Sequence, residues 1–319
     1  MSTAPCAYSE SQNGLIRVFP RRTKATPDDV LVFTTSPTKA FLQSLDKDIC
    51  GNNSDDEATA ILFQQAKERR EVHISTAFTY DIPKAEQLAE DWHKAGFAVK
   101  IGGPAFNLPS GDYVPGLYLK EGYVITSRGC HGKGGNRCWH CAVPRREQGL
   151  RELPIQNGTN ILDDNLLACS ENHIKAVFEM LSHQTKRPIF TGGLDTRLLR
   201  EWHVDLLRTA KTERMYFAYD SDDDLEPLLY AGRLLRNGGI VDSSGHKLKC
   251  YVLIGFPSDT IEKAEKRLLN TWRAGCWPYA MLYRNEKGET SEDWRKFQRT
   301  WTRPQIVYHK LKEVADRWL

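Results

Sequence analysis

Short apolar runs alternate with longer amphipathic stretches along this chain, which is the pattern of strands followed by helices. In the N-terminal part, apolar runs predict four strands, over residues 15–19, 30–34, 72–78 and 97–101. Helical spacing predicts helices over 58–70 and 83–95, the second with proline in its first turn and Gly96 after its end. The polar residues 51–57 predict a loop. This order of elements predicts a small α/β domain with a parallel sheet over residues 14–115.

The alternation continues more regularly over residues 116–289. Six apolar runs predict strands, over residues 123–126, 160–162, 188–191, 214–219, 249–254 and 279–283. Four amphipathic stretches predict helices between them, over residues 170–181, 200–209, 225–237 and 260–274. Ser170 is the expected N-cap of the first of these helices. Each strand ends in polar residues or glycine, and active sites of α/β barrels gather at that end.

Length and composition indicate a globular protein. The 319 residues suffice for one large domain and a smaller one, and the net charge of +3 implies no particular partner. No apolar run approaches the roughly 18 residues of a membrane helix, so no membrane partner is expected. Residues 1–13 do not resemble a secretion signal and are expected to form a flexible tail. The eight cysteines favour a reducing, cytoplasmic location over a disulfide scaffold.

Residues 124–144, VITSRGCHGKGGNRCWHCAVP, are the most informative stretch. They predict a short strand and then a glycine-rich loop that contains Cys130, Cys138 and Cys141. Thiolates so close together are soft ligands for zinc, copper(I) or an iron–sulfur cluster. A structural zinc site needs four protein ligands, so zinc requires His131 or His140 as the fourth, whereas three thiolates on a [4Fe–4S] cluster leave one iron open. Unligated thiols are the third alternative.

This loop resembles that of the radical S-adenosylmethionine (SAM) superfamily, in which three cysteines bind a [4Fe–4S] cluster and the open iron binds SAM. The usual spacing is C-x3-C-x2-C with an aromatic residue before the last cysteine. Here the spacing is C-x7-C-x2-C, and His140, with Trp139 beside it, stands at the aromatic position. The four additional residues fall in the run 131–137, where extra loop length costs little free energy.

Downstream segments extend the resemblance over residues 120–290. They are the polar cluster 163–165 after the second strand, GLDTR at 193–197, FAYDS at 217–221 and VLIGFPSDT at 252–260, in which Asp259 replaces the usual glutamate. Their order and spacing match the family. The resemblance implies a partial (β/α)6 TIM-like barrel over 116–289, preceded by a small Rossmann-like α/β domain over 14–115. Residues 290–319 are then a C-terminal helical extension that packs on the barrel.

The resemblance also implies a role for individual residues. Cys130, Cys138 and Cys141 are the metal ligands. Three neighbouring polar residues, Asp163, Asp164 and Asn165, are expected to bind the SAM ammonium through an oxygen acceptor. For Asp163 the alternative is a carboxylate at a helix N-terminus without chemical consequence.

Further cofactor-binding and catalytic residues are expected at the other strand ends. Arg197 is predicted to pair with the SAM carboxylate or, alternatively, to form a salt bridge with Asp220. Asp220 is predicted to contact the SAM ribose or the substrate. Ile254 and Gly255 are expected to lie against adenine, since a side chain at Gly255 would clash; a simple turn glycine is the alternative. His140, together with Trp139, is expected to shield the cluster or to stack on adenine.

The implied activity is reductive cleavage of SAM to a 5′-deoxyadenosyl radical, which abstracts a hydrogen atom from a substrate. It requires an external flavodoxin- or ferredoxin-like electron donor. Cobalamin-assisted methyl transfer is an alternative outcome on the same scaffold. The pattern D-x-H-x-x-G at 91–96 resembles a cobalamin-binding motif, but it is predicted to lie on a helix, where His93 is an ordinary surface residue. Gly102 and Gly103 would still let a flat cofactor approach the backbone.

The substrate class is the least determined feature. Residues 290–305 interleave aromatic and cationic side chains that suit stacking on bases and pairing with phosphates. The same spacing is that of an amphipathic helix on the barrel, with Trp294, Phe297 and Trp301 inward, and we favour this interpretation. Nucleobase or nucleic-acid modification is the preferred hypothesis for the reaction, with a peptide or a small metabolite as the alternative substrate. The alternative to an enzyme is a nucleic-acid-binding module that contains zinc or an iron–sulfur cluster and has no SAM chemistry.

Overall fold

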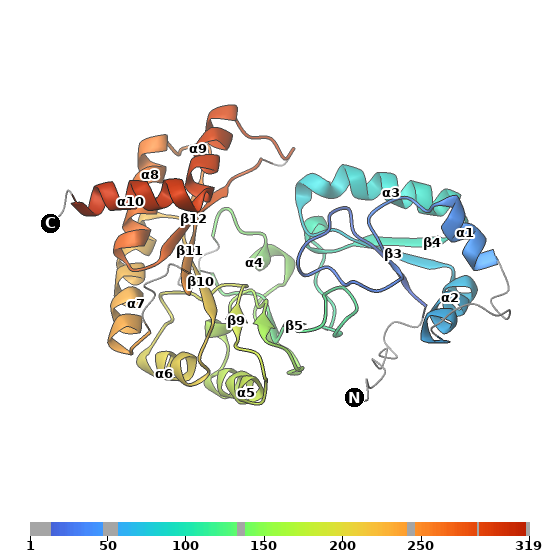
Figure 1. The fold of residues 1–319 in the computed structure, drawn as a ribbon, viewed down its shortest axis with the longest axis horizontal. Helices are drawn as coiled ribbons and strands as arrows, with labels where there is room; N and C mark the ends of the chain where they lie inside the picture. Colours follow the sequence, from blue (N-terminus) through green and yellow to red (C-terminus); the bar gives the residue numbers. More distant parts are fainter. Residues whose placement is uncertain (1–13, 47–56, 133–137, 241–245, 286, 317–319) are drawn as a thin grey trace. The chain divides into compact units, whose positions relative to one another are not determined.

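The computed structural model describes residues 14–46, 57–132, 138–240, 246–285 and 287–316 (Figure 1). The chain divides into two compact units. The N-terminal unit comprises Met1–Tyr123 and Arg145–Gln148, and the C-terminal unit comprises Val124–Pro144 and Gly149–Leu319. Both contain a parallel sheet with helices, so the predicted α/β class is confirmed. The predicted tail 1–13, most of the predicted loop 51–57 and the inserted residues 133–137 lie outside the described residues.

The N-terminal unit contains a sheet of four parallel strands in the order β2-β1-β3-β4. The strands are β1 (Ile16–Val18), β2 (Val32–Phe33), β3 (Glu71–Ser75) and β4 (Ala98–Gly102). The helices are α1 (Lys39–Asp46), α2 (Glu57–Arg69) and α3 (Ile82–Lys94). All four strands and the last two helices were predicted; α1 was not.

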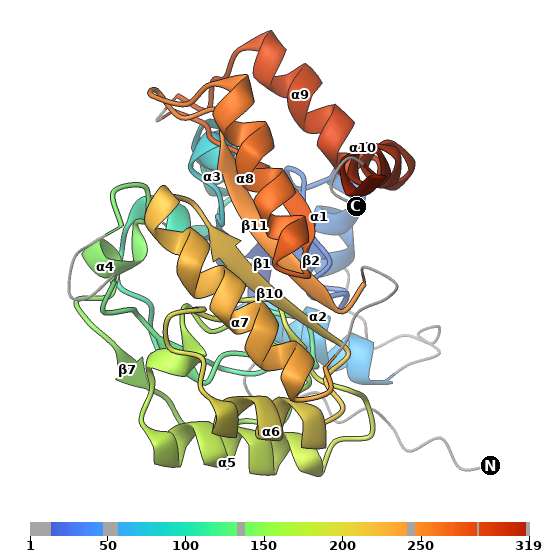
Figure 2. The ribbon, with the colours of Figure 1, turned by 90° about the vertical axis from the view of Figure 1, so that its left-hand side faces the viewer.

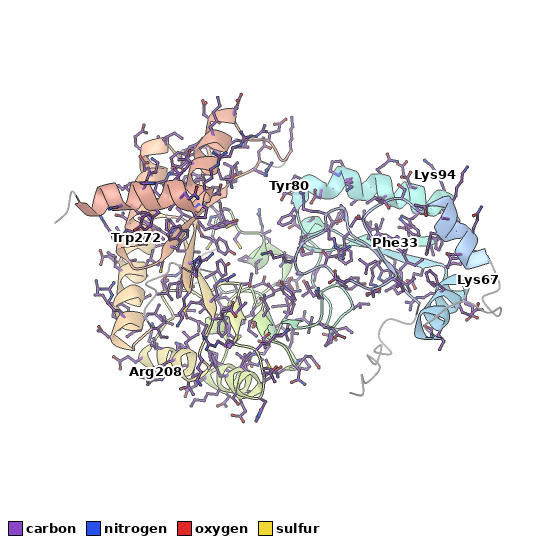
Figure 3. The ribbon with its side chains drawn as sticks, in the orientation of Figure 1. Phe33, Lys67, Tyr80, Lys94, Arg208 and Trp272 are labelled. Carbon is purple, nitrogen blue, oxygen red and sulfur yellow. The ribbon has the colours of Figure 1, made fainter. Side chains whose placement is uncertain are left out.

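Aromatic packing holds this unit together. Phe33, which Figure 3 labels, packs edge-on against Phe41 and Trp92. Trp92 also contacts Phe97. Trp92 is completely buried, whereas the adjacent His93 is exposed on the last turn of α3. The prediction that the D-x-H-x-x-G pattern lies on a helix is therefore confirmed.

The C-terminal unit is built on a six-stranded sheet in the order β12-β11-β10-β9-β8-β5. Its strands are β5 (Tyr123–Val124), β8 (Asn160–Ile161), β9 (Ile189–Phe190), β10 (Arg214–Tyr219), β11 (Leu248–Ile254) and β12 (Trp277–Leu282). The neighbours from β8 to β12 pair in parallel. All six predicted strands are present, and their order in the sheet follows their order in the chain. Parallel pairing brings their carboxyl ends to one edge of the sheet.

Helices α5 (Glu171–Ser182), α6 (Glu201–Thr209), α7 (Leu225–Asn237) and α8 (Ile261–Arg273) lie on one side of this sheet (Figures 1 and 2). The Ser170 hydroxyl accepts a hydrogen bond from the backbone N–H of His173, so Ser170 is the predicted N-cap of α5. Thr260 caps α8 in the same way. An antiparallel pair, β6 (Ser127–Arg128) with β7 (Arg151–Glu152), was not predicted; its strands are too short to show alternation.

Two helices, α9 (Glu292–Thr302) and α10 (Pro304–Asp316), form the C-terminal extension. Trp301 of α9 is buried, Trp294 and Phe297 are half-buried, and Arg295, Lys296 and Arg299 are exposed. The predicted amphipathic helix is therefore confirmed, and its aromatic residues pack against the unit. The break between α9 and α10 falls at Pro304, which starts a new helix because proline lacks an N–H and fits the first turn. No helix in the described part of the chain is long and apolar enough to cross a membrane.

Gly192 lies where the backbone after β9 closely approaches the backbone after β8, and a substitution there tests this packing. A Cβ atom at this position would lie 2.1 Å from the backbone oxygen of Asp163. We predict that Gly192→Ala lowers stability by about 1–3 kcal/mol, because two backbone segments must separate. Thermal unfolding measures the effect. Gly111→Ala, where a Cβ meets open space, is the matched control and should leave the melting temperature almost unchanged. Equal melting temperatures for the two variants would contradict the packing described.

Candidate metal and cofactor site

The three cysteines of the loop after β6 lie at the carboxyl edge of the six-stranded sheet. Each is partly exposed, and the backbone N–H of Cys141 donates to the carbonyl of Cys138. Cys130 Sγ accepts two hydrogen bonds, from the backbone N–H of Gly132 at 3.3 Å and from Nδ2 of Asn165 at 3.4 Å. N–H donors to sulfur are a common feature around metal-bound cysteines.

The ionisation of Cys141 is opposed by its surroundings. Burial raises the pKa of Cys141, and the charges of Cys138, Cys130 and Asp164 raise it further. A cation bound beside this thiol would favour its ionised form, as in a thiolate-bound metal. In the described residues, no three His, Cys, Asp or Glu side chains are grouped as ligands for a metal ion. The fit to a cluster is thus one of ligand type and charge.

Asp163 stabilises the backbone at the carboxyl edge of the sheet. Its side chain is 1% exposed, and its oxygens accept hydrogen bonds from the backbone N–H of Thr126 (2.6 Å) and from the hydroxyls of Thr126 (2.5 Å) and Ser127 (2.8 Å). Burial raises the pKa of the carboxyl, and these hydrogen bonds oppose the rise. Asp164 similarly accepts from the backbone N–H of Gly129 at 2.8 Å. Together the two carboxylates fix the segment that leads into the cysteine loop.

Asn165 and Arg197 meet on one carboxylate oxygen. Oδ2 of Asp195 accepts from Asn165 Nδ2 at 3.4 Å and from Arg197 Nη2 at 2.5 Å, while Oδ1 accepts from Arg197 Nε at 2.8 Å. Arg197 therefore pairs with Asp195, and the alternative pair with Asp220 is not formed. Two buried atoms of this group, Oδ1 of Asn165 and Nη1 of Arg197, have no hydrogen-bond partner within the described residues. Buried polar atoms are nearly always paired, so these two are candidates for a ligand.

Asp220 pairs instead with His140. Oδ2 of Asp220 lies 3.3 Å from Nε2 of His140, and both side chains are about one-fifth exposed. The buried Nδ1 of His140 has no partner in the part of the chain that the structure describes. The backbone N–H groups of Asp220 and Ser221 both donate to Oδ2 of Asp224. This contact fixes the end of β10 and so orients Asp220.

Gly255 is required by an indole ring. Its φ is +76°, and a Cβ atom would lie 2.9 Å from two ring atoms of Trp294 on α9. Ile254 is fully buried, and Oδ2 of Asp259 accepts from the Gly255 N–H (2.9 Å) and from Arg267 (2.7 Å). The glycine was predicted to make room for adenine; here the space beside it is taken by Trp294.

Trp139 of the cysteine loop joins an aromatic group at the ends of β11 and β12. Its ring centroid lies 5.4 Å from that of Phe256 and 5.9 Å from that of Tyr283, and the side chain is 55% exposed. The ring also contacts His140 edge-on at 5.2 Å. An exposed indole with aromatic support offers a flat surface for a planar ligand.

Several residues of this edge were not predicted as site residues. The capping carboxylate Asp224 had a local signal, because DSDDD at 220–224 places an acidic residue three positions after Ser221, as in a capping box. The contacts of Trp294 with Gly255 and of Trp139 with Tyr283 join distant parts of the sequence. No local pattern identifies them.

Alkylation of free thiols tests the described exposure. Burial raises the pKa of Cys169 to about 12, and Cys250 and Cys276 are buried in the unit. We predict that iodoacetamide, at about pH 8 and without metal, labels Cys130 at least about tenfold faster than Cys169 or Cys250, with Cys141 slower than Cys130. Mass spectrometry of peptides from the folded protein provides the rates. The cysteines should react at equal rates only after the protein is unfolded. Equal alkylation rates in the folded protein would contradict the structure.

The carboxyl edge of the C-terminal sheet thus combines three thiols, an amide and a guanidinium on one carboxylate, and an exposed aromatic group. These belong to residues 130–283 and surround a single cysteine loop. A scan against protein-family models, a search of curated proteins and a search of solved structures found no match to this chain.

Proposed function

We propose that the chain is a radical SAM enzyme whose C-terminal unit is a partial (β/α)6 barrel. The six parallel-ordered strands and the cysteine loop after the first of them support this assignment. Cys130, Cys138 and Cys141 would hold the cluster, since soft thiolate ligands suit iron–sulfur clusters. When bound, the cluster supplies the electron, taken from an external flavodoxin- or ferredoxin-like donor, that cleaves SAM to methionine and a 5′-deoxyadenosyl radical.

The observation that carries the proposal is the pair of unpartnered atoms on Asn165 and Arg197. SAM has an ammonium, which needs an acceptor, and a carboxylate, which needs a donor. Oδ1 of Asn165 is a buried acceptor and Nη1 of Arg197 is a buried donor, and both residues bond to Asp195. An α-amino acid group is complementary to this pair. Asn165 is thereby preferred over Asp163, whose oxygens are already engaged.

The surrounding residues would orient SAM and exclude water. Asp195 fixes the Asn165 amide and the Arg197 fork, so that both atoms meet the ligand in one geometry. The His140–Asp220 pair would contact the ribose or the substrate, and Trp139 would cover an aromatic ring such as adenine. Cobalamin is not part of the proposal, because His93 lies on the last turn of α3 and not in a loop after the first strand.

Anaerobic reconstitution with iron and sulfide tests the proposal. We expect about four irons per chain and formation of 5′-deoxyadenosine on addition of SAM and a strong reductant. Alanine at Cys130, Cys138 or Cys141 should abolish both, whereas Cys169→Ala, which removes a buried thiol outside the loop, should leave both in place. Iron content and chromatography of the nucleoside provide the readouts. A colourless protein with stoichiometric zinc would contradict the proposal and favour a zinc module.

Asn165 should also affect the potential of the cluster, because its amide donates to Cys130 Sγ. Such a donor favours the reduced, more negative state. We predict that Asn165→Ala lowers the midpoint potential by about 40 mV, equivalent to one hydrogen bond of about 1 kcal/mol in a one-electron couple. Spectroscopic redox titration measures it. The control, Asn237→Ala at an exposed position on α7, should titrate like the unmodified protein. An unchanged potential in Asn165→Ala would contradict the contact.

A further inference from the structure

The six-stranded sheet has two different faces at β10, β11 and β12. Side chains on one face are buried towards the helices, among them Phe217, Val252 and Ala280. The alternate positions hold Tyr216 on β10, Tyr251 on β11, and Trp277 and Tyr279 on β12, all partly or largely exposed. We call these four residues the aromatic platform.

The platform is continuous across three adjacent strands. Tyr216 and Tyr251 are stacked, with ring centroids 4.8 Å apart and planes at 14°. Tyr251 contacts Tyr279 edge-on at 5.6 Å, and Tyr279 is 43% exposed. A sheet normally buries large aromatic rings on its covered face; rings left partly exposed on the opposite face form a flat surface on which planar groups can stack.

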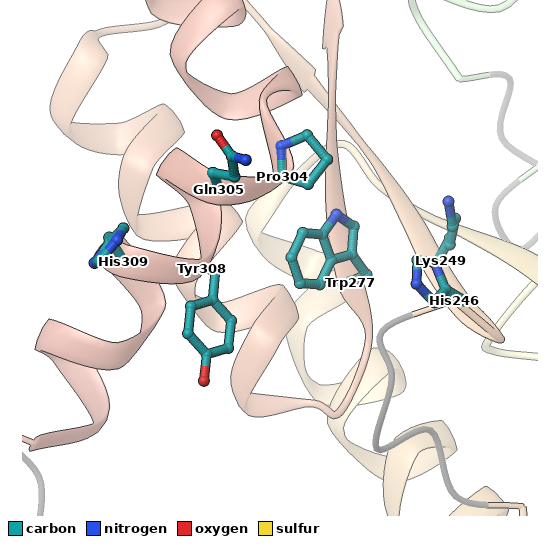
Figure 4. Close-up of a pocket in the computed structure, with 7 residues that line it drawn as sticks. All are labelled: His246, Lys249, Trp277, Pro304, Gln305, Tyr308 and His309. Atoms are coloured by element: carbon teal, nitrogen blue, oxygen red, sulfur yellow. The ribbon is translucent and has the colours of Figure 1, made fainter.

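A cavity opens at one end of the platform (Figure 4). Its volume is about 400 Å³, within the range of small-ligand sites. Trp277 of the platform lines it together with Tyr308 and His309 of α10, and Lys249 and His246 lie at its other side. The described lining includes one lysine and two histidines and no carboxylate. Aromatic surface combined with the cationic Lys249 suits a planar ligand that has a negative charge.

The β10 side of the platform leads towards the candidate cofactor site. The carbonyl of Tyr216 accepts a hydrogen bond from the backbone N–H of Leu194, the residue before Asp195. On β11, Lys249 and Tyr251 lie on the same face two residues apart, roughly 7 Å along the strand. The strand therefore places a cationic side chain close to the stacked rings.

We propose that the aromatic platform binds nucleotide units, with bases stacked on Tyr279, Tyr251 and Trp277 and a phosphate near Lys249. The shared chemistry of the ligand is a base with a phosphate, supplied by a single-stranded nucleic acid or by a free nucleotide. As a binding site the platform is independent of the cysteine loop. As the substrate site of the enzyme it rests on the proposed function.

Binding to the whole purified chain tests the inference. The probes are a fluorescently labelled short oligouridylate, followed by anisotropy, with uridine monophosphate, uridine and ribose 5-phosphate as competitors. Uracil is chosen because an adenine could also bind at the proposed SAM site. We expect the monophosphate to compete better than uridine or ribose 5-phosphate, since only it has both groups. If the labelled oligouridylate binds and the monophosphate displaces it, the site accepts free nucleotides as well as a strand. If the oligouridylate binds and only unlabelled oligouridylate displaces it, the site is specific for a strand.

Variants connect the binding to the platform. Tyr279→Ala should weaken oligouridylate binding about tenfold, as expected for the loss of one stacking surface. Tyr279→Phe, which keeps the ring, should bind within about twofold of the unmodified protein. Lys249→Ala should weaken binding and reduce the salt dependence by about one ion. The matched control is Tyr230→Ala, which removes an exposed tyrosine from α7.

Three results would overturn the inference. They are no binding of any probe, equal binding by Tyr279→Ala and Tyr279→Phe, and an equal loss in the Tyr230→Ala control. Because no step uses the cluster, iron content and SAM cleavage measured on the same preparations separate failure of the platform from failure of the proposed function. Circular dichroism shows whether Tyr279→Ala is folded. If it is not, the comparison of Tyr279→Phe with Tyr279→Leu replaces it, with the same criterion of equal binding.

Discussion

The rest of the site depends on the hydrogen bonds of Asn165, which donates to the sulfur of Cys130 and to the carboxylate of Asp195. Burial and the charges of Cys138, Cys130 and Asp164 raise the pKa of Cys141, so a bound cation would favour its ionised form. Cys130 Sγ accepts one N–H from the loop and one from Asn165. Asn165 in turn bonds to Asp195, which also binds Arg197. The loop, the amide and the guanidinium therefore form one connected polar group.

That connection would let one edge of a sheet serve the two proposed ligands. A metal cluster requires ionised sulfur, and an amino acid group requires an acceptor and a donor. Asn165 offers its amide N–H to sulfur and keeps its oxygen unpartnered within the described structure, while Arg197 keeps one nitrogen unpartnered. Asp163 and Asp164 hold the backbone that delivers the loop. In the proposed site, the two aspartates therefore hold the backbone, while Asn165 and Arg197 contact the ligands.

Much of the fold could be predicted from the sequence, because its elements have strong local periodicity. All six strands of the C-terminal sheet and the helices that follow them were predicted, as was the Ser170 cap. The α1 helix and the β6–β7 pair were missed, since both are short and the strands have only two residues each. The assignment of the three cysteines as metal ligands came from their spacing and stays a prediction. The sequence did not predict which polar atoms remain unpartnered, because it does not show that Arg197 pairs with Asp195 rather than with Asp220.

The reason for Gly255 illustrates the same limit. The sequence shows a glycine after a strand, and the indole that requires it belongs to α9, about 40 residues later in the chain.

The central claim, a site-differentiated cluster on Cys130, Cys138 and Cys141, is tested most directly by the Mössbauer spectrum of protein reconstituted with isotopically enriched iron, recorded with and without SAM. The account predicts a [4Fe–4S] spectrum in which SAM shifts the signal of a single iron site. A spectrum without such a cluster, or one that SAM leaves unchanged, would contradict it.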